Sequence, residues 1–184
     1  GAFRYPRGMR LLPLLLLPLL AQASAAAPRL VTVIVVDQLK PETMPRSGQG
    51  FGRLLREGFE YSAARHGHLP TETAPGHTAL LTGRFPSDTG IVGNEWWDAA
   101  AGRRIEAPED PAGGPSGAQN LLVPTLGDLI KERNPASKTV SVAAKDRSAA
   151  LMGGHAADRV LWFHKKDGAF ASSSARRASI APLR

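Results

Sequence analysis

The sequence predicts an α/β/α sandwich built around a mostly parallel sheet. Apolar runs typical of strands alternate along the chain with stretches that have the pattern of helices. The first run, Leu30–Val36, is continuously apolar and rich in β-branched residues. Such a run is typical of a strand covered on both faces, as at the centre of a parallel sheet. Alternation of strand and helix favours one sheet with helices on both sides.

The remaining elements follow in order along the chain. The sequence predicts helices at 51–57, 79–81 and 123–131, and strands at 59–64, 139–144 and 160–163. Gly58 is the expected C-cap of the first helix. The middle helix is expected to be buried, with breakers after it. Residues 99–120 are rich in Gly, Pro and Ala and are expected to form an exposed excursion rather than a domain linker.

The composition allows one globular domain and disfavours nucleic acid as a partner. The chain has 184 residues, 42% of them hydrophobic, and a formal net charge of +7. Six of the positive charges lie near the two ends: Arg4, Arg7, Arg10, Arg176, Arg177 and Arg184. Without them the net charge is about +1, so the basic residues form no footprint on the folded body.

Residues Met9–Ala27 have the pattern of a bacterial secretory signal. Basic residues precede the apolar run Leu11–Leu20, and small residues with Ala-x-Ala spacing follow it. A membrane anchor is the alternative, but the run is about ten residues long, against roughly twenty for a bilayer span. The sequence therefore predicts a periplasmic or secreted protein with no stable membrane anchor after cleavage. Pre-sequence and signal together occupy residues 1–27.

Cysteine is absent from the chain. Neither a disulfide framework nor a thiolate metal site is therefore expected, although export would bring the chain to an oxidising compartment. Any metal ion would have to use oxygen and imidazole ligands.

Asp37 ends the first predicted strand. Open α/β sheets bind their ligands at the carboxyl ends of the strands, so this is a suitable position for a metal ligand. An aspartate that caps the following turn is an equally good interpretation of the position alone.

Thr73 lies in the most informative segment of the chain, 69–83, and it is expected to be a helix N-cap with Pro75 in the first turn. A helix N-terminus favours a bound phosphate, because free N–H groups and the positive end of the dipole meet there. A threonine hydroxyl needs a metal ion or a base to become a nucleophile. Position alone does not distinguish such a nucleophile from a plain cap.

Three short motifs around this segment carry a resemblance to a known family. They are Pro-Thr-x-Thr-Ala-Pro-Gly-His at 70–77, Leu-Thr-Gly-x-x-Pro at 81–86 and Gly-Ile-Val-Gly-Asn at 90–94. Together they resemble the threonine-nucleophile branch of the alkaline phosphatase superfamily. The nucleotide pyrophosphatases and phosphodiesterases of the same superfamily are similar across this stretch.

The resemblance implies a role for three residues. It makes Thr73 the catalytic nucleophile and a zinc ligand, and it makes Asp37 a second zinc ligand. An asparagine that contacts the substrate phosphate follows the nucleophile by 21 positions in the family, and Asn94 stands at this distance from Thr73.

Lys145 and Arg147 follow the strand predicted at 139–144. In the phosphate-monoesterase branch of the superfamily a Lys-x-Arg pair at this point contacts the non-bridging oxygens of the substrate, and diesterases generally lack it. Two cations suit the dianionic charge of a monoester, and a guanidinium group can bind two oxygens at once. Taken alone, the pair would be a solvated charge run.

Different roles are expected for the histidines and the tryptophans. His77 belongs to the threonine motif and is expected to support the nucleophile turn rather than to bind metal. The other histidines match no metal-ligand spacing: His66, His68, His155 and His164. Trp96 and Trp97 are expected to form either a wall of the pocket or an ordinary packed aromatic pair.

The resemblance covers residues 28–174 as the N-terminal part of an incomplete alkaline phosphatase-like catalytic domain, and the tail 175–184 is unmatched. A complete family site holds two zinc ions, and most of their ligands have no counterpart here. We therefore expect a phosphomonoesterase by family whose chain is inactive, or nearly so, by itself. The alternatives are a phosphodiesterase or nucleotide pyrophosphatase, and an exported phosphate-binding module or fragment without turnover. The expected partner is a small-molecule phosphate ester.

Overall fold

The computed structural model describes residues 28–110 and 116–172. The chain divides into two compact units, 1–34 and 35–184. The described part of the first unit, 28–34, contains no helix or strand. The predicted signal and the tail 175–184 lie outside the described residues.

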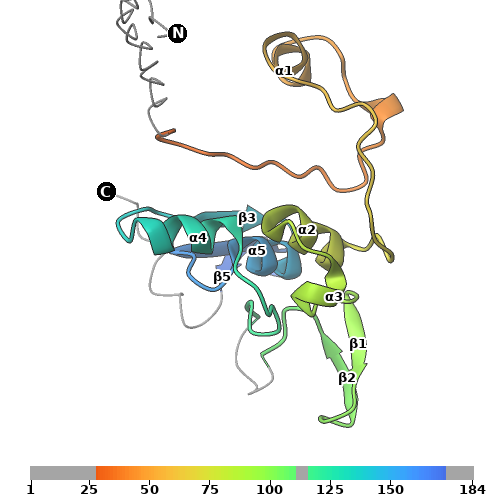
Figure 1. The fold of residues 1–184 in the computed structure, drawn as a ribbon, viewed down its shortest axis with the longest axis vertical. Coiled ribbons are helices and arrows are strands. Elements are labelled where there is room, and N and C mark those ends of the chain that lie inside the picture. Colours follow the sequence, from red (N-terminus) through yellow and green to blue (C-terminus); the bar gives the residue numbers. More distant parts are fainter. Residues whose placement is uncertain (1–27, 111–115, 173–184) are drawn as a thin grey trace, which may run out of the picture. The chain divides into compact units, whose positions relative to one another are not determined.

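The second unit has a mixed α/β architecture (Figure 1). Its elements are η1 (Pro41–Thr43), α1 (Phe51–Glu57), α2 (Thr73–Thr82), α3 (Pro86–Thr89), β1 (Glu95–Asp98), β2 (Arg103–Glu106), α4 (Leu126–Arg133), β3 (Val140–Ala143), α5 (Asp146–Gly153), β4 (Arg159–His164) and β5 (Ala169–Ser172). The predicted α/β class is confirmed.

A three-stranded sheet in the order β3-β4-β5 packs against α5. β3 and β4 run parallel and are connected through α5, as the connection of parallel strands requires. β5 returns antiparallel to β4. Ala149 and Ala150 of α5 pack on Val160 of β4, so small side chains let the helix lie close to the sheet. This packing of α5 on the sheet fixes where the start of α5 lies relative to the carboxyl end of β3.

A second cluster of buried residues joins α2 to α5. Ala74 and Leu151 are fully buried in it, together with Ile91 and two alanines from the segment 99–120. The prediction that 99–120 is merely an exposed excursion is therefore wrong. This segment forms β2, which pairs with β1 in an antiparallel hairpin, and its alanines are small enough to fill the space beside α2.

Two predicted strands are not formed. Residues 30–36 contain no strand in the described structure, and Leu30 and Ile34 are 80% and 74% exposed. Residues 59–64 are irregular, with Phe59 95% exposed. β-branched and aromatic residues favour a strand only when a neighbouring strand supplies hydrogen bonds and packing. Neither segment has such a neighbour among the described strands.

The predicted helices are present, α1 with the expected limits and α2 and α4 with shifted ones. α1 ends before Gly58, as expected, and α2 ends before Gly83, whose φ of 65° favours glycine. α4 begins only at Leu126, because Thr125 and Asp128 form a capping box at its start.

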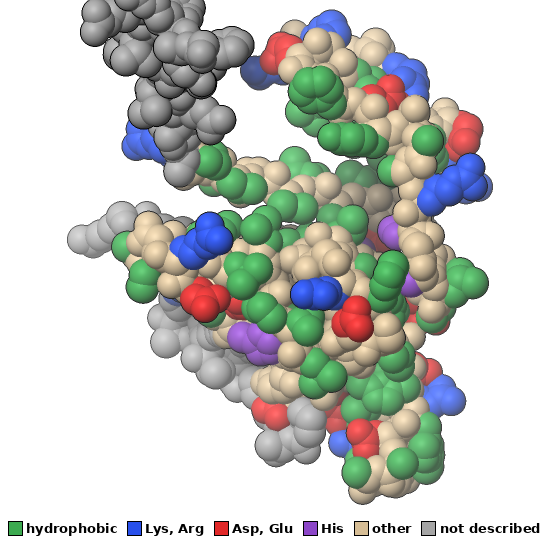
Figure 2. All heavy atoms as spheres, viewed as in Figure 1, with side chains coloured by type: hydrophobic (Ala, Val, Ile, Leu, Met, Phe, Trp, Pro, Cys, Tyr) green, Lys and Arg blue, Asp and Glu red, His purple; other side chains and the backbone are tan. Residues whose placement is uncertain are grey.

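Apolar side chains lie on the surface of α2 and α4 (Figure 2). Leu80 is 56% exposed, so the expected burial of 79–81 is wrong at this position. Leu129 and Ile130 of α4 are 43% and 36% exposed. Across 28–110 and 116–172 no helix combines the length and the apolar character that a membrane crossing requires.

Asp158 fastens α4 to the start of β3. Its Oδ2 accepts hydrogen bonds from Lys131 Nζ and from the Thr139 N–H, both at 2.8 Å. Burial alone would raise the pKa of Asp158, but Lys131, Thr139 and Lys138 together lower this pKa from 3.8 to about 2.

We expect this aspartate to make folding sensitive to acid. Because its pKa in the folded chain is lowered, the carboxylate stabilises the fold above about pH 4, and this contribution is lost as the pH falls toward 2. Urea unfolding across this range should show a smaller pH dependence in Asp158→Asn than in the wild type. Asp88→Asn, at an exposed position of α3, is the matched control. Equal pH dependence in both variants and the wild type would contradict the assignment.

Candidate active site

Thr73 is the first residue of α2, and Glu72 is the N-cap. The Gly76 N–H donates to the Glu72 carbonyl, which begins the helix one residue earlier than the sequence suggested. The expectation that Thr73 caps the helix is therefore wrong. The Thr73 hydroxyl instead donates a hydrogen bond to Asp37 Oδ2, at 3.4 Å.

Asp37 is the common partner of Thr73 and Lys145. Its Oδ2 also accepts from Lys145 Nζ at 3.3 Å. The next residue, Gln38, has a φ of 62°, so the chain turns sharply after Asp37. The Thr73 hydroxyl and the Lys145 ammonium group, from distant parts of the sequence, thus meet at the Asp37 carboxylate. Asp37 and Thr73 are the two predicted metal ligands.

Asn94 lies beside the first turn of α2. Its Oδ1 accepts a hydrogen bond from the Ala74 N–H at 2.9 Å. Its own N–H donates to Glu72 Oε2 at 2.6 Å. Since the Asn94 oxygen is held by a backbone donor, the side-chain NH₂ is the group left to serve as a donor elsewhere.

Lys145 and Arg147 lie at the start of α5, directly after the carboxyl end of β3. This is the edge of a sheet where α/β proteins bind ligands. Asp146, between them, accepts from Ser116 Oγ at 3.2 Å and from the Arg147 N–H at 2.7 Å. Arg147 Nε is buried and has no hydrogen-bond partner among the described residues. A buried donor of this kind is suited to an anionic ligand.

His77 supports the start of α2 from within. Its ring is buried and hydrogen-bonded to the Thr73 backbone. Burial lowers the pKa of His77, while the Thr73 bond and Asp37 raise it and Lys145 lowers it further. The net decrease favours a neutral ring, as expected of a structural histidine.

Other aromatic and imidazole rings lie outside these contacts. Trp96 packs against the core cluster, whereas Trp97 is 66% exposed, because successive residues of β1 face opposite sides. They do not form a packed pair. His155 Nε2 lies 2.9 Å from the Leu121 carbonyl, and its Nδ1 lies 3.4 Å from Asp128.

Asp37 and Thr73 fit part of a zinc site. Their oxygens converge, and both are ligand types that zinc accepts. A zinc ion takes four ligands, or three protein groups and water. Within 28–110 and 116–172 no group of three His, Asp or Glu side chains is arranged to hold a metal. Two oxygens therefore supply only part of the ligand set.

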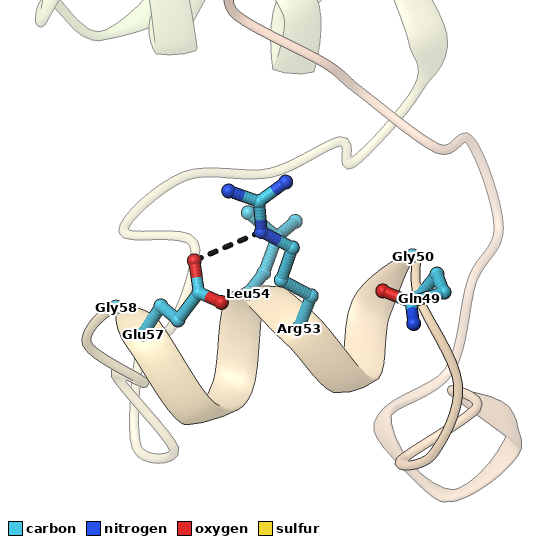
Figure 3. Close-up of a pocket in the computed structure, with 6 residues that line it drawn as sticks. All are labelled: Gln49, Gly50, Arg53, Leu54, Glu57 and Gly58. Atoms are coloured by element: carbon cyan, nitrogen blue, oxygen red, sulfur yellow. Dashed lines mark hydrogen bonds and ion pairs between the residues drawn. The ribbon is translucent and has the colours of Figure 1, made fainter.

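An open hollow of about 490 Å³ lies along α1, away from these residues (Figure 3). Its lining consists of Gln49, Gly50, Arg53, Leu54, Glu57 and Gly58. Arg53 Nε pairs with Glu57 Oε2 at 2.8 Å across one helical turn. The hollow contains no residue of the predicted site.

Comparison with known proteins agrees with the resemblance seen in the sequence. Residues 31–179 match the model of the type I phosphodiesterase / nucleotide pyrophosphatase family. The chain belongs to this family. It is 42% identical to alkaline phosphatase PhoD of Zymomonas mobilis over 150 residues, which are 73% of this chain and 25% of that protein. It is 39% identical to alkaline phosphatase PhoK of a Sphingomonas species, over 79% of this chain and 28% of that protein.

Solved structures of an alkaline phosphatase are also similar to this chain. The crystal structure of alkaline phosphatase PafA is similar with a TM-score of 0.67 and 32% identity, over 72% of this chain and 28% of that chain. A PafA variant with one threonine, one asparagine, one lysine and one arginine substituted is similar with a TM-score of 0.53 and 31% identity, over 56% of this chain and 22% of that chain. The present chain thus spans about a quarter of the length of these relatives.

Glu72 is the residue that sequence reasoning missed. It occupies the variable position of the threonine motif, and its contact is with a backbone N–H 22 positions away. No residue pattern signals a contact of this kind, because every residue except proline has a backbone N–H.

Asn94→Ala should lower the free energy of unfolding by about 1–3 kcal/mol, because it leaves the buried Ala74 N–H without its acceptor. Asn94→Asp keeps an acceptor oxygen and should lose much less. Urea titrations followed by tryptophan fluorescence measure both. Equal stability of the two variants would show that the Ala74 bond contributes little.

Proposed function

We propose that the full-length protein containing this segment hydrolyses phosphate monoesters, with Thr73 as the nucleophile. The observation that carries the proposal is the convergence of Thr73, Asp37 and Lys145 within hydrogen-bond distance, with Asn94 bonded to the turn that begins at Thr73.

The reaction divides into two displacements. Thr73 Oγ1 loses its proton and forms a bond to phosphorus while the bond to the leaving oxygen breaks, and the leaving oxygen departs with that electron pair and takes up a proton to give the alcohol. Water then attacks the phosphorylated Thr73, which regains its hydroxyl as inorganic phosphate leaves. Zinc bound by Asp37 and Thr73, with further ligands, would lower the pKa of the hydroxyl and offset the charge of the phosphoryl group.

Three side chains would hold the phosphoryl oxygens. The Asn94 NH₂ group is a neutral donor with its oxygen already held by Ala74. Lys145 supplies a compact charge, and Arg147 supplies a planar group able to bind two oxygens. Their role is to bind the charge that develops on these oxygens in the transition state.

The substituted PafA variant supports this assignment. Its threonine and asparagine are separated by the same number of positions as Thr73 and Asn94, and its lysine and arginine by the same number as Lys145 and Arg147. The four residue types substituted in that protein are those proposed here to act on the phosphoryl group.

The second candidate is hydrolysis of phosphate diesters or nucleotide pyrophosphates, which the name of the matching family favours. Lys145 and Arg147 favour the monoester, since a diester has only two non-bridging oxygens to share between them. A phosphate-binding module without turnover is the third candidate and predicts anion binding with no phosphoryl transfer.

The signal-like sequence at 9–27 supports export to the periplasm or beyond.

Thr73→Ala should abolish the burst of product release that accompanies a phosphoryl-enzyme intermediate, because no hydroxyl remains to attack phosphorus. The test uses an aryl phosphate and a full-length family member that carries this segment. Thr71→Ala, two residues earlier at an exposed position, is the control and should keep the burst. A burst that survives Thr73→Ala would exclude Thr73 as the nucleophile.

Lys145→Ala and Arg147→Ala should each reduce kcat/KM for a monoester by about a hundredfold or more and reduce it much less for a diester. The reason is that a diester carries less charge for these cations to stabilise. Arg133→Ala, at an exposed position of α4, should leave both activities unchanged. Equal losses on both substrates would place the diesterase ahead of the monoesterase.

A further inference from the structure

Two hydrogen bonds join Asn94 to the start of α2, one to Glu72 and one to Ala74. Glu72 Oε2 accepts from the Asn94 N–H at 2.6 Å, and Asn94 Oδ1 accepts from the Ala74 N–H at 2.9 Å. We call this pair of bonds the Glu72–Asn94 clasp. Each side chain binds the backbone of the other segment, so the clasp fixes both the position and the rotation of the Asn94 loop relative to the first turn of α2.

The Glu72 side chain does not cap its own helix. Glu72 is the N-cap of α2, yet its carboxylate makes no cap hydrogen bond to the first turn. It binds the Asn94 N–H instead. Negative charge beside a helix N-terminus is favourable, so the carboxylate is stabilised there without serving as a cap.

The loop before Asn94 is closely packed at Gly93. A Cβ atom added to Gly93 would lie 3.0 Å from the Glu95 carbonyl oxygen and 3.7 Å from Glu72 Oε2. The first distance is tighter than ordinary contact, so a side chain at position 93 would push the Glu95 carbonyl aside by a few tenths of an ångström. The second distance is that of ordinary van der Waals contact, so the close packing at Gly93 is against the backbone of Glu95.

We propose that Glu72 is a positioning residue for phosphate binding and acts through Asn94. With its oxygen held by Ala74 and its backbone held by Glu72, the Asn94 side chain can direct only its NH₂ group toward a ligand. Glu72 thereby presents a pre-oriented donor to a phosphoryl oxygen beside Thr73. This inference rests on the proposed phosphate site, which the experiments below test separately.

Amide hydrogen exchange of the 184-residue chain tests the clasp itself. In Glu72→Ala the Asn94 N–H should exchange about tenfold faster than in the wild type, because a hydrogen bond to a charged acceptor is lost. Glu72→Gln keeps an acceptor oxygen and should restore most of the protection. Glu132→Ala, at an exposed position of α4, is the control and should change nothing at Asn94.

Binding of inorganic phosphate to the same variants tests the positioning role. Glu72→Ala should raise the Kd for phosphate by about tenfold when Asn94 is present and by less than twofold in an Asn94→Ala background. The shift of the Asn94 side-chain NH₂ signal on phosphate addition should be lost in Glu72→Ala and largely recovered in Glu72→Gln. A residue that only stabilised the fold would weaken phosphate binding equally in both backgrounds.

The two measurements separate the possible failures. An Asn94 N–H that exchanges equally fast in the wild type and in Glu72→Ala would overturn the clasp, whatever phosphate does. Equal effects of Glu72→Ala with and without Asn94 would overturn the positioning role. Phosphate that binds equally well to the wild type and to Asn94→Ala would contradict the proposed phosphate site, and the positioning role with it, while the exchange data would still establish the clasp.

Discussion

The hydrogen bond from the Ala74 N–H to Asn94 Oδ1 connects the two segments on which the candidate site depends. Ala74 is fully buried against α5, and its N–H is one of the first-turn donors that an α-helix leaves unpaired. Burying that donor without an acceptor would cost free energy, so this hydrogen bond constrains the position of the Asn94 side chain. The same bond orients the Asn94 NH₂ group and leaves the neighbouring Thr73 hydroxyl free to face Asp37.

The cationic side of the site depends on how α5 is held at its two ends. At its carboxyl end, Asp128 accepts hydrogen bonds from the His155 and Ala156 N–H groups, which ties the helix to the capping box of α4. At its start, Lys145 pairs with Asp37, but both side chains are nearly half exposed. Exposed pairs of this kind contribute about 0–1 kcal/mol, so Lys145 can leave Asp37 for a phosphate at little cost.

The resemblance named Asp37, Thr73, Asn94 and the pair after β3, because each is a residue type with its own chemistry, and their roles stay predictions. It did not name Glu72, whose partner is a backbone N–H. The run 30–36 was wrongly predicted as a strand because strand formation depends on a partner distant in the sequence. The segment 99–120 was misjudged because alanines that resemble a linker in composition also fit closely packed cores.

The central claim is that residues from four separate segments bind one phosphoryl group. A crystal structure of the full-length protein with tungstate, an analogue of phosphate, tests this most directly. The account predicts tungstate oxygens within hydrogen-bond distance of Asn94 Nδ2, Lys145 Nζ and the Arg147 guanidinium, with Thr73 Oγ1 next to the tungsten atom. Tungstate bound elsewhere, with Arg147 directed away from it and Lys145 still paired with Asp37, would contradict the account.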